Sequence, residues 1–224
     1  MIRRTLIVAG GTAAAAGLWL AAAMVFPWLL LFPHHRMVGQ TPVWSEAPLT
    51  DGIEAVIRRS DARLRASPLY RPEASRRPVY LTDGGLRWRI LSFDAAGAFA
   101  QTRAIRETVV VNRSSIERDR VWNRAPVAGE RRLSDVIAHE RTHGLIRMRF
   151  GVTADAIYPL WVREGYCDHV AGSSSLSDAE AARLTAERRN PPALAYYQAR
   201  KRVEAALRAN GGSVDRLFAS ARPR

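Results

Sequence analysis

A long uncharged stretch near the N-terminus constrains the fold of this chain more than any other feature. From Thr5 to Pro33 no residue is charged, and Ala, Leu, Val, Ile, Trp and Phe dominate. About 20 apolar residues in a helix that rises about 1.5 Å per residue cross the hydrocarbon core of a bilayer. The stretch therefore predicts an N-terminal signal-anchor or transmembrane helix within residues 1–33, followed by a folded domain.

The charges on either side of this stretch predict its orientation. Arg3 and Arg4 precede it, whereas Arg36 follows it and acidic residues come soon after. The positive-inside rule then gives a single-pass membrane protein whose N-terminus is cytoplasmic and whose C-terminal domain is extracytoplasmic. Ala21-Ala22-Ala23 would also suit signal-peptide cleavage, but the apolar residues that follow would leave a hydrophobic new N-terminus, which favours an uncleaved anchor.

Proline, glycine and polar residues mark residues 34–48 as a linker, so the domain is expected over residues 49–224. Apolar residues at helical spacing predict a helix over residues 52–66. Strand-like runs follow at residues 78–81, 86–93 and 108–112, although the second has a mixed pattern.

Helices are expected to dominate after Arg132. Capping residues, glycines and prolines predict helices at residues 134–150, 159–171, 177–189, 193–209 and 214–220. A small sheet followed by a helical C-terminal half makes the expected class α+β.

The excess of basic residues brings anionic partners into consideration. Lys and Arg number 34 against 21 Asp and Glu, which gives a net charge of +13. The arginines are spread along the chain in pairs, without a dense basic block and without a zinc-finger, RNP or helix-turn-helix signature. We therefore expect a solvated basic surface and no nucleic-acid partner.

The sequence His-Glu-Arg-Thr-His at residues 139–143 lies in the first helix of the second half. A spacing of four residues places His139 and His143 on one helical face, about 5–6 Å apart at Cβ, so that their ring nitrogens can converge on one ion. Catalytic zinc takes three protein ligands and keeps one position for water. The two histidines therefore predict part of a zinc site that needs a third ligand.

Glu164 is the candidate for the third ligand, because it lies on the next predicted helix. Asp168, four residues later on the same face, is expected to accept the spare ring N–H of His139 and to fix its tautomer. Cys167, the only cysteine, points away from the Glu164 face of the helix, which favours a small buried residue over a metal ligand.

These motifs resemble those of gluzincin metallopeptidases, which belong to the peptidase MA-like group. His-Glu-x-x-His lies on one helix, and Trp161-x-x-Glu164-Gly165-x-x-Asp168 lies on the next. The resemblance is specific over residues 133–172, and a weaker similarity extends to the following helix. It implies a gluzincin-like domain that holds one Zn²⁺ and hydrolyses peptide bonds.

The resemblance also implies a role for Glu140. Zinc lowers the pKa of its bound water to about 7 and polarises the substrate carbonyl. Glu140 is then expected to act as general base, which takes the proton of the water and passes it to the leaving amine. The substrate is expected to be a peptide or protein, and the membrane a partner through the N-terminal helix.

Such a reaction needs a hydrogen-bond donor to the oxyanion. Gluzincins use a Tyr or His outside the ligand set, and Tyr196 and Tyr197 are favoured here because similar enzymes use that helix. Tyr158, Tyr166 and His169 remain alternatives. The run at residues 108–112 is expected either to pair with an extended peptide beside the cleft or to be an interior strand.

Two other functions remain consistent with the residues. A membrane-tethered, non-catalytic zinc-binding domain would keep the metal site and recognise a peptide or envelope partner without turnover. A basic surface-binding protein would use the histidines for structure alone.

Overall fold

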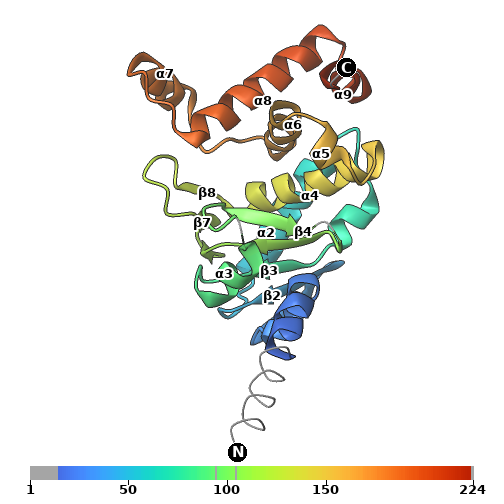
Figure 1. The fold of residues 1–224 in the computed structure, drawn as a ribbon, viewed down its shortest axis with the longest axis vertical. Coiled ribbons are helices and arrows are strands. Elements are labelled where there is room, and N and C mark those ends of the chain that lie inside the picture. Colours follow the sequence, from blue (N-terminus) through green and yellow to red (C-terminus); the bar gives the residue numbers. More distant parts are fainter. Residues whose placement is uncertain (1–14, 94, 104, 223–224) are drawn as a thin grey trace, which may run out of the picture.

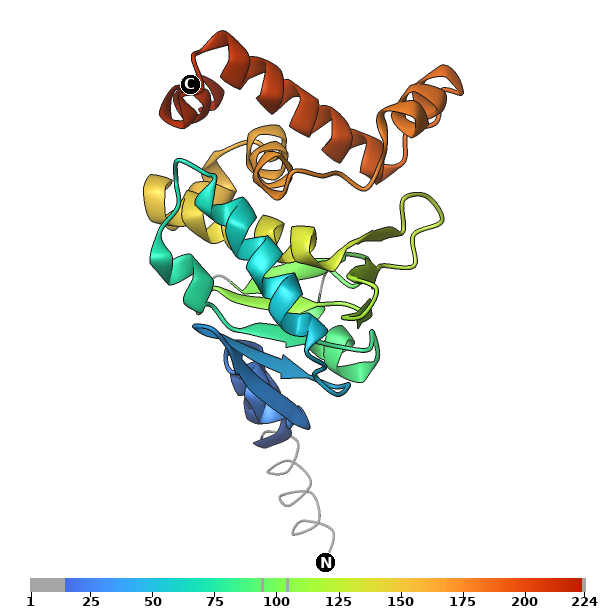
Figure 2. The same ribbon diagram turned by 180° about the vertical axis from the view of Figure 1, so that it is seen from behind.

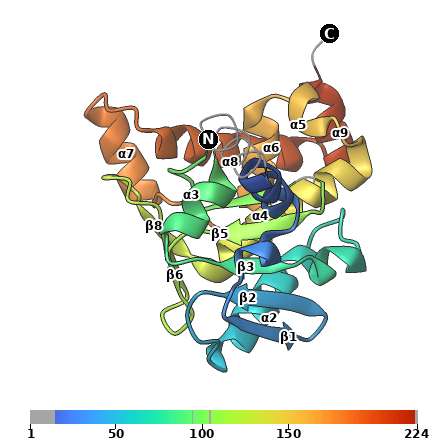
Figure 3. The ribbon, with the colours of Figure 1, turned by 60° about the horizontal axis from the view of Figure 1, so that its bottom comes forward.

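The computed structural model describes residues 15–93, 95–103 and 105–222. Its fold is α+β, with most strands in the first half and helices in the second (Figure 1). Five strands form a mixed sheet in the order β1-β2-β3-β5-β4, and Figure 3 shows β1 at one edge. These strands are β1 (His34–Val38), β2 (Thr41–Ser45), β3 (Val79–Leu81), β4 (Ala100–Arg103) and β5 (Thr108–Val111).

A second, antiparallel sheet of three short strands precedes the longest helices. It consists of β6 (Ser114–Ser115), β7 (Arg120–Trp122) and β8 (Glu130–Arg132). The helices are α2 (Gly52–Arg65), α3 (Leu86–Ser92), α4 (Leu133–Phe150), α5 (Ala154–Ile157), α6 (Leu160–Ala171), α7 (Asp178–Ala186), α8 (Pro192–Ala209) and α9 (Val214–Ala221), with the 3-10 helices η1 (Pro27–Leu30) and η2 (Pro72–Arg76).

The central strands β3 and β5 are apolar because both faces of the sheet are covered. They pair in parallel, with Val79 opposite Val109. Val109 and Val111 pack in the core with α2 and α4, whereas Val110 packs on the opposite face with Trp88 of α3. Such two-sided burial produces a continuous hydrophobic run instead of alternation.

Helix α4 lies between the sheet and the C-terminal helices. The sheet and α2 pack on one side of it, and α6 packs on the other, with α8 stacked beyond α6 (Figures 1 and 2). Because α4 is covered on nearly every side, its apolar residues follow no single face. This order of layers places the residues of α4 and α6 against each other, and the candidate site forms there.

The prediction of a transmembrane helix at the N-terminus is wrong for the described residues. No helix there is both long and apolar enough to cross a bilayer. The helix at residues 15–25 ends before η1, and Leu30 and Phe32 pack on the sheet against Tyr80, with the Phe32 and Tyr80 rings 5.1 Å apart. These apolar residues therefore cover a sheet face, and the predicted single-pass topology loses its basis. Residues 5–14 of the predicted anchor lie outside the described part.

Residues 34–48 were expected to form a linker, but most of them form β1 and β2. The two strands pair antiparallel, and β2 then pairs in parallel with β3. Val38 and Val43 are buried in the core between the sheet and α2. Pro42 is compatible with a strand here, and the Pro and Gly content that suggested a tether reflects the hairpin instead.

Other differences concern short elements, whereas the long helices follow their end signals. Residues 86–93 were expected as a strand, but α3 forms there because Trp88 and Leu91, at helical spacing, are the buried pair. The expected capping box of α7 is confirmed, since Ser177 and Glu180 bond reciprocally. Gly172 ends α6 in the left-handed conformation, as its position predicted.

Candidate metal centre

Two histidines of α4 and three residues of α6 form the centre of the candidate site. The imidazole rings of His139 and His143 are 5.1 Å apart between centroids. Ligand atoms of His139, His143 and Cys167 all lie within 4.8 Å of one another, so this group could hold a metal ion. Cys167 was expected to point away from the Glu164 face and not to be a metal ligand, but its sulfur lies within reach of both rings.

The carboxylate of Glu164 also lies close to both histidines. Its Oε2 atom is 3.2 Å from Nε2 of His139 and 3.6 Å from Nε2 of His143. Burial raises the pKa of Glu164, but the two imidazoles outweigh burial and hold that pKa well below its usual range. Two ring nitrogens thus face one carboxylate oxygen that stays ionised.

Asp168 orients His139 from behind. Nδ1 of His139 lies 2.7 Å from Oδ1 of Asp168, which also accepts a 2.8 Å bond from Arg131. Burial by itself lowers the pKa of His139, but Asp168 and Glu164 raise it to about 10. The bond from Nδ1 leaves Nε2 facing Glu164, which is the arrangement expected of a ligating histidine with a carboxylate behind it.

His143 has an acidic neighbour of its own. Its Nδ1 lies 3.9 Å from Oδ1 of Asp155, a residue of α5. Asp155 also contacts Arg147 and Arg163, so its carboxylate is held among basic groups. Each histidine therefore has Nε2 directed to Glu164 and Nδ1 directed to a separate carboxylate.

Glu140 is held by a residue of the sheet. The hydroxyl of Thr102, on the edge strand β4, lies 2.8 Å from Oε2 of Glu140 and 2.7 Å from its backbone carbonyl. One hydroxyl proton cannot serve both oxygens at once, but either bond keeps the Glu140 side chain beside β4. The carboxylate lies at the floor of the cleft described next.

A cleft of about 910 Å³ opens over these residues. His139, Glu140, His143 and Glu164 line it, whereas Cys167 does not and is fully buried. The lining of the cleft includes the charged side chains of Arg147, Asp155 and Arg163. It also includes mostly small apolar residues from β4, from the segment before it and from the loop after β7, among them Ala95, Ala98, Phe99, Ala100, Val127 and Ala128.

The tyrosine and histidine candidates lie in different places. Tyr196 of α8 lines the cleft, and burial, with nearby carboxylates, raises the pKa of its hydroxyl to about 12. Tyr197 turns away and donates to Asp178 at 2.9 Å. Tyr166 bonds Ser67 within the core.

Tyr158 packs in the core between the C-terminal helices. His169 lines a separate cavity beside α2 and α8. Only Tyr196 of the five candidates therefore contributes to the cleft over the histidines.

Comparison of the chain with protein-family models, with curated proteins and with solved structures found no match. The site is therefore interpreted from its own geometry and from general metal chemistry.

Three residues of the site carried no recognisable signal in the sequence. Thr102 lies in a polar edge strand that has no strand pattern, and Arg131 is one of many dispersed arginines. Asp155 belongs to the loop region between the two ligand-bearing helices, a region without distinctive composition. Their roles depend on the tertiary packing of β4, β8 and α5 against α4.

Proposed function

We propose that the protein is a zinc-dependent peptide hydrolase. The observation that carries the proposal is that Nε2 of His139 and Nε2 of His143 both face Oε2 of Glu164, at 3.2 and 3.6 Å. Two imidazoles and one carboxylate are a common ligand set of catalytic zinc. These atoms fit a divalent ion, because a cation between them would be coordinated by both Nε2 atoms and by the Glu164 oxygen that they face.

Glu164 suits the role of third ligand better than Cys167 does. A catalytic ion must contact both the protein and the substrate, and Glu164 lines the cleft whereas Cys167 has no exposed surface. An ion bound through Cys167 would lie deeper between α4 and α6, away from a substrate. The position of Glu164 therefore favours a catalytic site, and that of Cys167 a packing role.

Zinc bound here would supply an acidified water and would polarise a carbonyl group. Glu140 would accept the proton of that water and deliver it to the leaving amine. Thr102 bonds to Oε2 of Glu140, so Oε1 is the atom left to carry the proton. Tyr196, whose hydroxyl stays protonated near neutral pH, would donate to the oxyanion of the tetrahedral intermediate.

The edge of the sheet offers a place for an extended substrate. The strand expected in this position, at residues 108–112, is interior, because β5 pairs with β3 and β4. The edge strand is β4, and its residues Ala100 to Thr102 line the cleft together with the preceding Phe99. A peptide that pairs with β4 would pass the carboxylate of Glu140 and the two histidines.

A peptidase assay tests the proposal. The zinc-loaded protein is expected to cleave a mixture of fluorescence-quenched peptides, and Glu140→Gln is expected to lower cleavage by about 10²- to 10⁴-fold, because the amide cannot act as base. Elemental analysis of the variant should still find zinc. Cleavage retained in Glu140→Gln would contradict the proposal.

The same assay separates hydrolysis from zinc-dependent recognition without turnover. If the wild-type protein binds one zinc per chain and cleaves no peptide of the mixture, the site is a binding site and the hydrolase proposal is wrong.

A further inference from the structure

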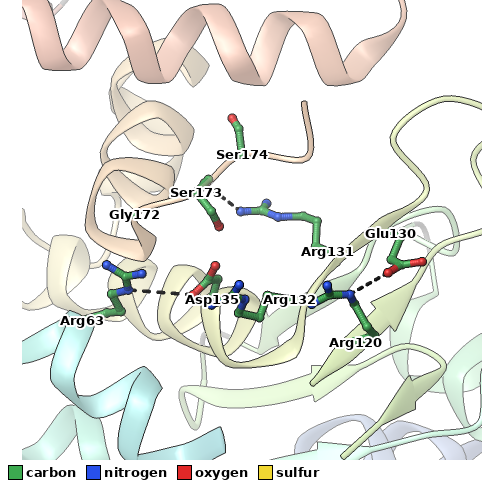
Figure 4. Close-up of a pocket in the computed structure, with 9 residues that line it drawn as sticks. All are labelled: Arg63, Arg120, Glu130, Arg131, Arg132, Asp135, Gly172, Ser173 and Ser174. Carbon is green, nitrogen blue, oxygen red and sulfur yellow. Dashed lines mark hydrogen bonds and ion pairs between the residues drawn. The ribbon is translucent and has the colours of Figure 1, made fainter. Parts of the chain in front are cut away.

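A second cavity, of about 380 Å³, lies behind the metal centre. The N-terminal end of α4, the strands β7 and β8, and the loop that follows α6 surround it (Figure 4). Arg131 lines both this cavity and the cleft, so the two are neighbours. The lining residues are Arg63, Arg120, Glu130, Arg131, Arg132, Asp135, Gly172, Ser173 and Ser174.

Basic groups exceed acidic groups in this cavity. Four arginines line it against two carboxylates, those of Glu130 and Asp135. Arg131 is also paired with the buried Asp168 at 2.8 Å, so one positive charge remains in excess. Arg120 is paired with Glu130 at 2.7 Å, whereas the contact of Arg63 with Asp135 is 3.9 Å long. The side chain of Arg132 has no partner among the described residues.

Several donors around the cavity lack a partner as well. Nε of Arg131 and the hydroxyls of Ser173 and Ser174 are buried and accept or donate no hydrogen bond within the described part of the chain. The guanidinium of Arg131 is itself only 7% exposed. A buried donor without a partner is unfavourable, so an acceptor at this position would stabilise the site.

We infer that this cavity binds a compact tetrahedral dianion, either inorganic phosphate or the phosphoryl group of a small molecule. The excess positive charge attracts an anion, and arginine forks bind phosphate oxygens in pairs. The serine hydroxyls can rotate between staggered positions and donate to the remaining oxygens.

Calorimetric titration of the full chain with inorganic phosphate tests this site. The protein is first treated with a chelator, because phosphate also binds metals, and chloride holds the ionic strength constant. Arg132→Gln should weaken phosphate binding at least about fivefold, the effect of losing one unit charge at about 4 Å in water. Arg118→Gln, the same change at an exposed arginine outside the cavity, should leave binding unchanged.

A change of opposite sign sharpens the test. Glu130→Gln removes a carboxylate that competes with the anion for Arg120, so it should tighten phosphate binding by about the same factor. Arg131 is left intact throughout, because it also contacts Asp168. Success or failure here is independent of the metal centre, since the measurement uses metal-free protein.

Further ligands distinguish the chemistry of the anion. Sulfate should compete with phosphate, and an organic phosphate that binds more tightly than inorganic phosphate would identify a phosphorylated small molecule as the source. A titration to about 10 mM phosphate, ten times a dissociation constant of about 1 mM, that gives no heat of binding would overturn the inference. Equal weakening by Arg132→Gln and Arg118→Gln, or preference for succinate over phosphate, would also overturn it.

Discussion

The contact between Thr102 and Glu140 shows how a single residue outside a motif can hold one of its side chains in place. Glu140 sits on α4, but its carboxylate orientation depends on a hydroxyl from β4, 2.8 Å away. A freely rotating glutamate would spend less time in the position needed for proton transfer. Thr102 is therefore a positioning residue for the proposed base.

Thr102→Val should lower kcat about tenfold or more with little change in KM, because the substrate contacts remain while Glu140 loses its anchor. Zinc content should stay at the wild-type value. Thr102→Ser, which keeps the hydroxyl, should restore most of kcat. If valine and serine reduce kcat equally, the hydroxyl does not position Glu140.

Asp168 is expected to matter for metal affinity more than for folding of distant regions. Asp168→Asn removes the charge that faces Nδ1 of His139 and should weaken zinc binding by about 10- to 100-fold in a competition with a chromophoric chelator. Asp215→Asn, the same substitution in an exposed pair with Arg149, should leave the zinc affinity unchanged. An unchanged affinity in Asp168→Asn would show that Asp168 does not support the ligand.

At the level of elements, the long helices could be predicted from sequence because their ends carry local signals. Ser177 with Glu180, and Gly172 after α6, act through bonds within one or two turns. The strands β1, β2 and β4 were not predicted, because β2 pairs with the distant β3, and the residues of β1 and β4 show no clear apolar pattern. The spacing of His139 and His143 is likewise local, whereas Thr102 and Asp155 reach the site only through packing.

Helices α6 and α8 approach each other closely at Gly165. A Cβ at Gly165 would lie 2.4 Å from the backbone oxygen of Ala199, so only glycine allows the two helices to pack as they do. Gly165 is adjacent to Glu164, so the contact with α8 helps to fix the position of the Glu164 carboxylate relative to α4. The motif glycine thus has a packing reason.

Gly165→Ala should destabilise the protein by about 1–3 kcal/mol in urea unfolding, because α6 and α8 must separate. Gly97→Ala provides the comparison, since a Cβ there meets nothing within 4 Å. It should change the free energy of unfolding by less than about 0.5 kcal/mol. Equal effects of the two substitutions would refute the packing argument.

For the whole molecule, the apolar N-terminal residues illustrate why hydrophobicity alone did not predict the architecture. An apolar run has the same composition whether it contacts lipid or a sheet. In this protein Leu30 and Phe32 cover β3 and β5. β1 and β2 precede residue 49, and they belong to the sheet because β2 pairs with β3 and β1 pairs with β2. Experiments on the site therefore need the full chain and not a fragment that begins at residue 49.

A metal held between α4 and α6 should also stabilise the molecule as a whole. Zinc at about 100 times its dissociation constant adds about 2.7 kcal/mol to the free energy of unfolding, provided that it binds only the folded chain. The urea midpoint should therefore rise with zinc and fall with chelator. In Glu164→Gln the difference between the two conditions should be much smaller, and an undiminished difference would argue against Glu164 as ligand.

Zinc content by elemental analysis tests the central claim most directly. The full-length wild-type protein and Cys167→Ser should each hold one zinc per chain, and Glu164→Gln and His143→Ala should hold none after dialysis. Zinc lost from Cys167→Ser but kept by Glu164→Gln would make the buried thiol the third ligand and contradict the catalytic arrangement. Absence of zinc from the wild-type protein after reconstitution would contradict the metal centre itself.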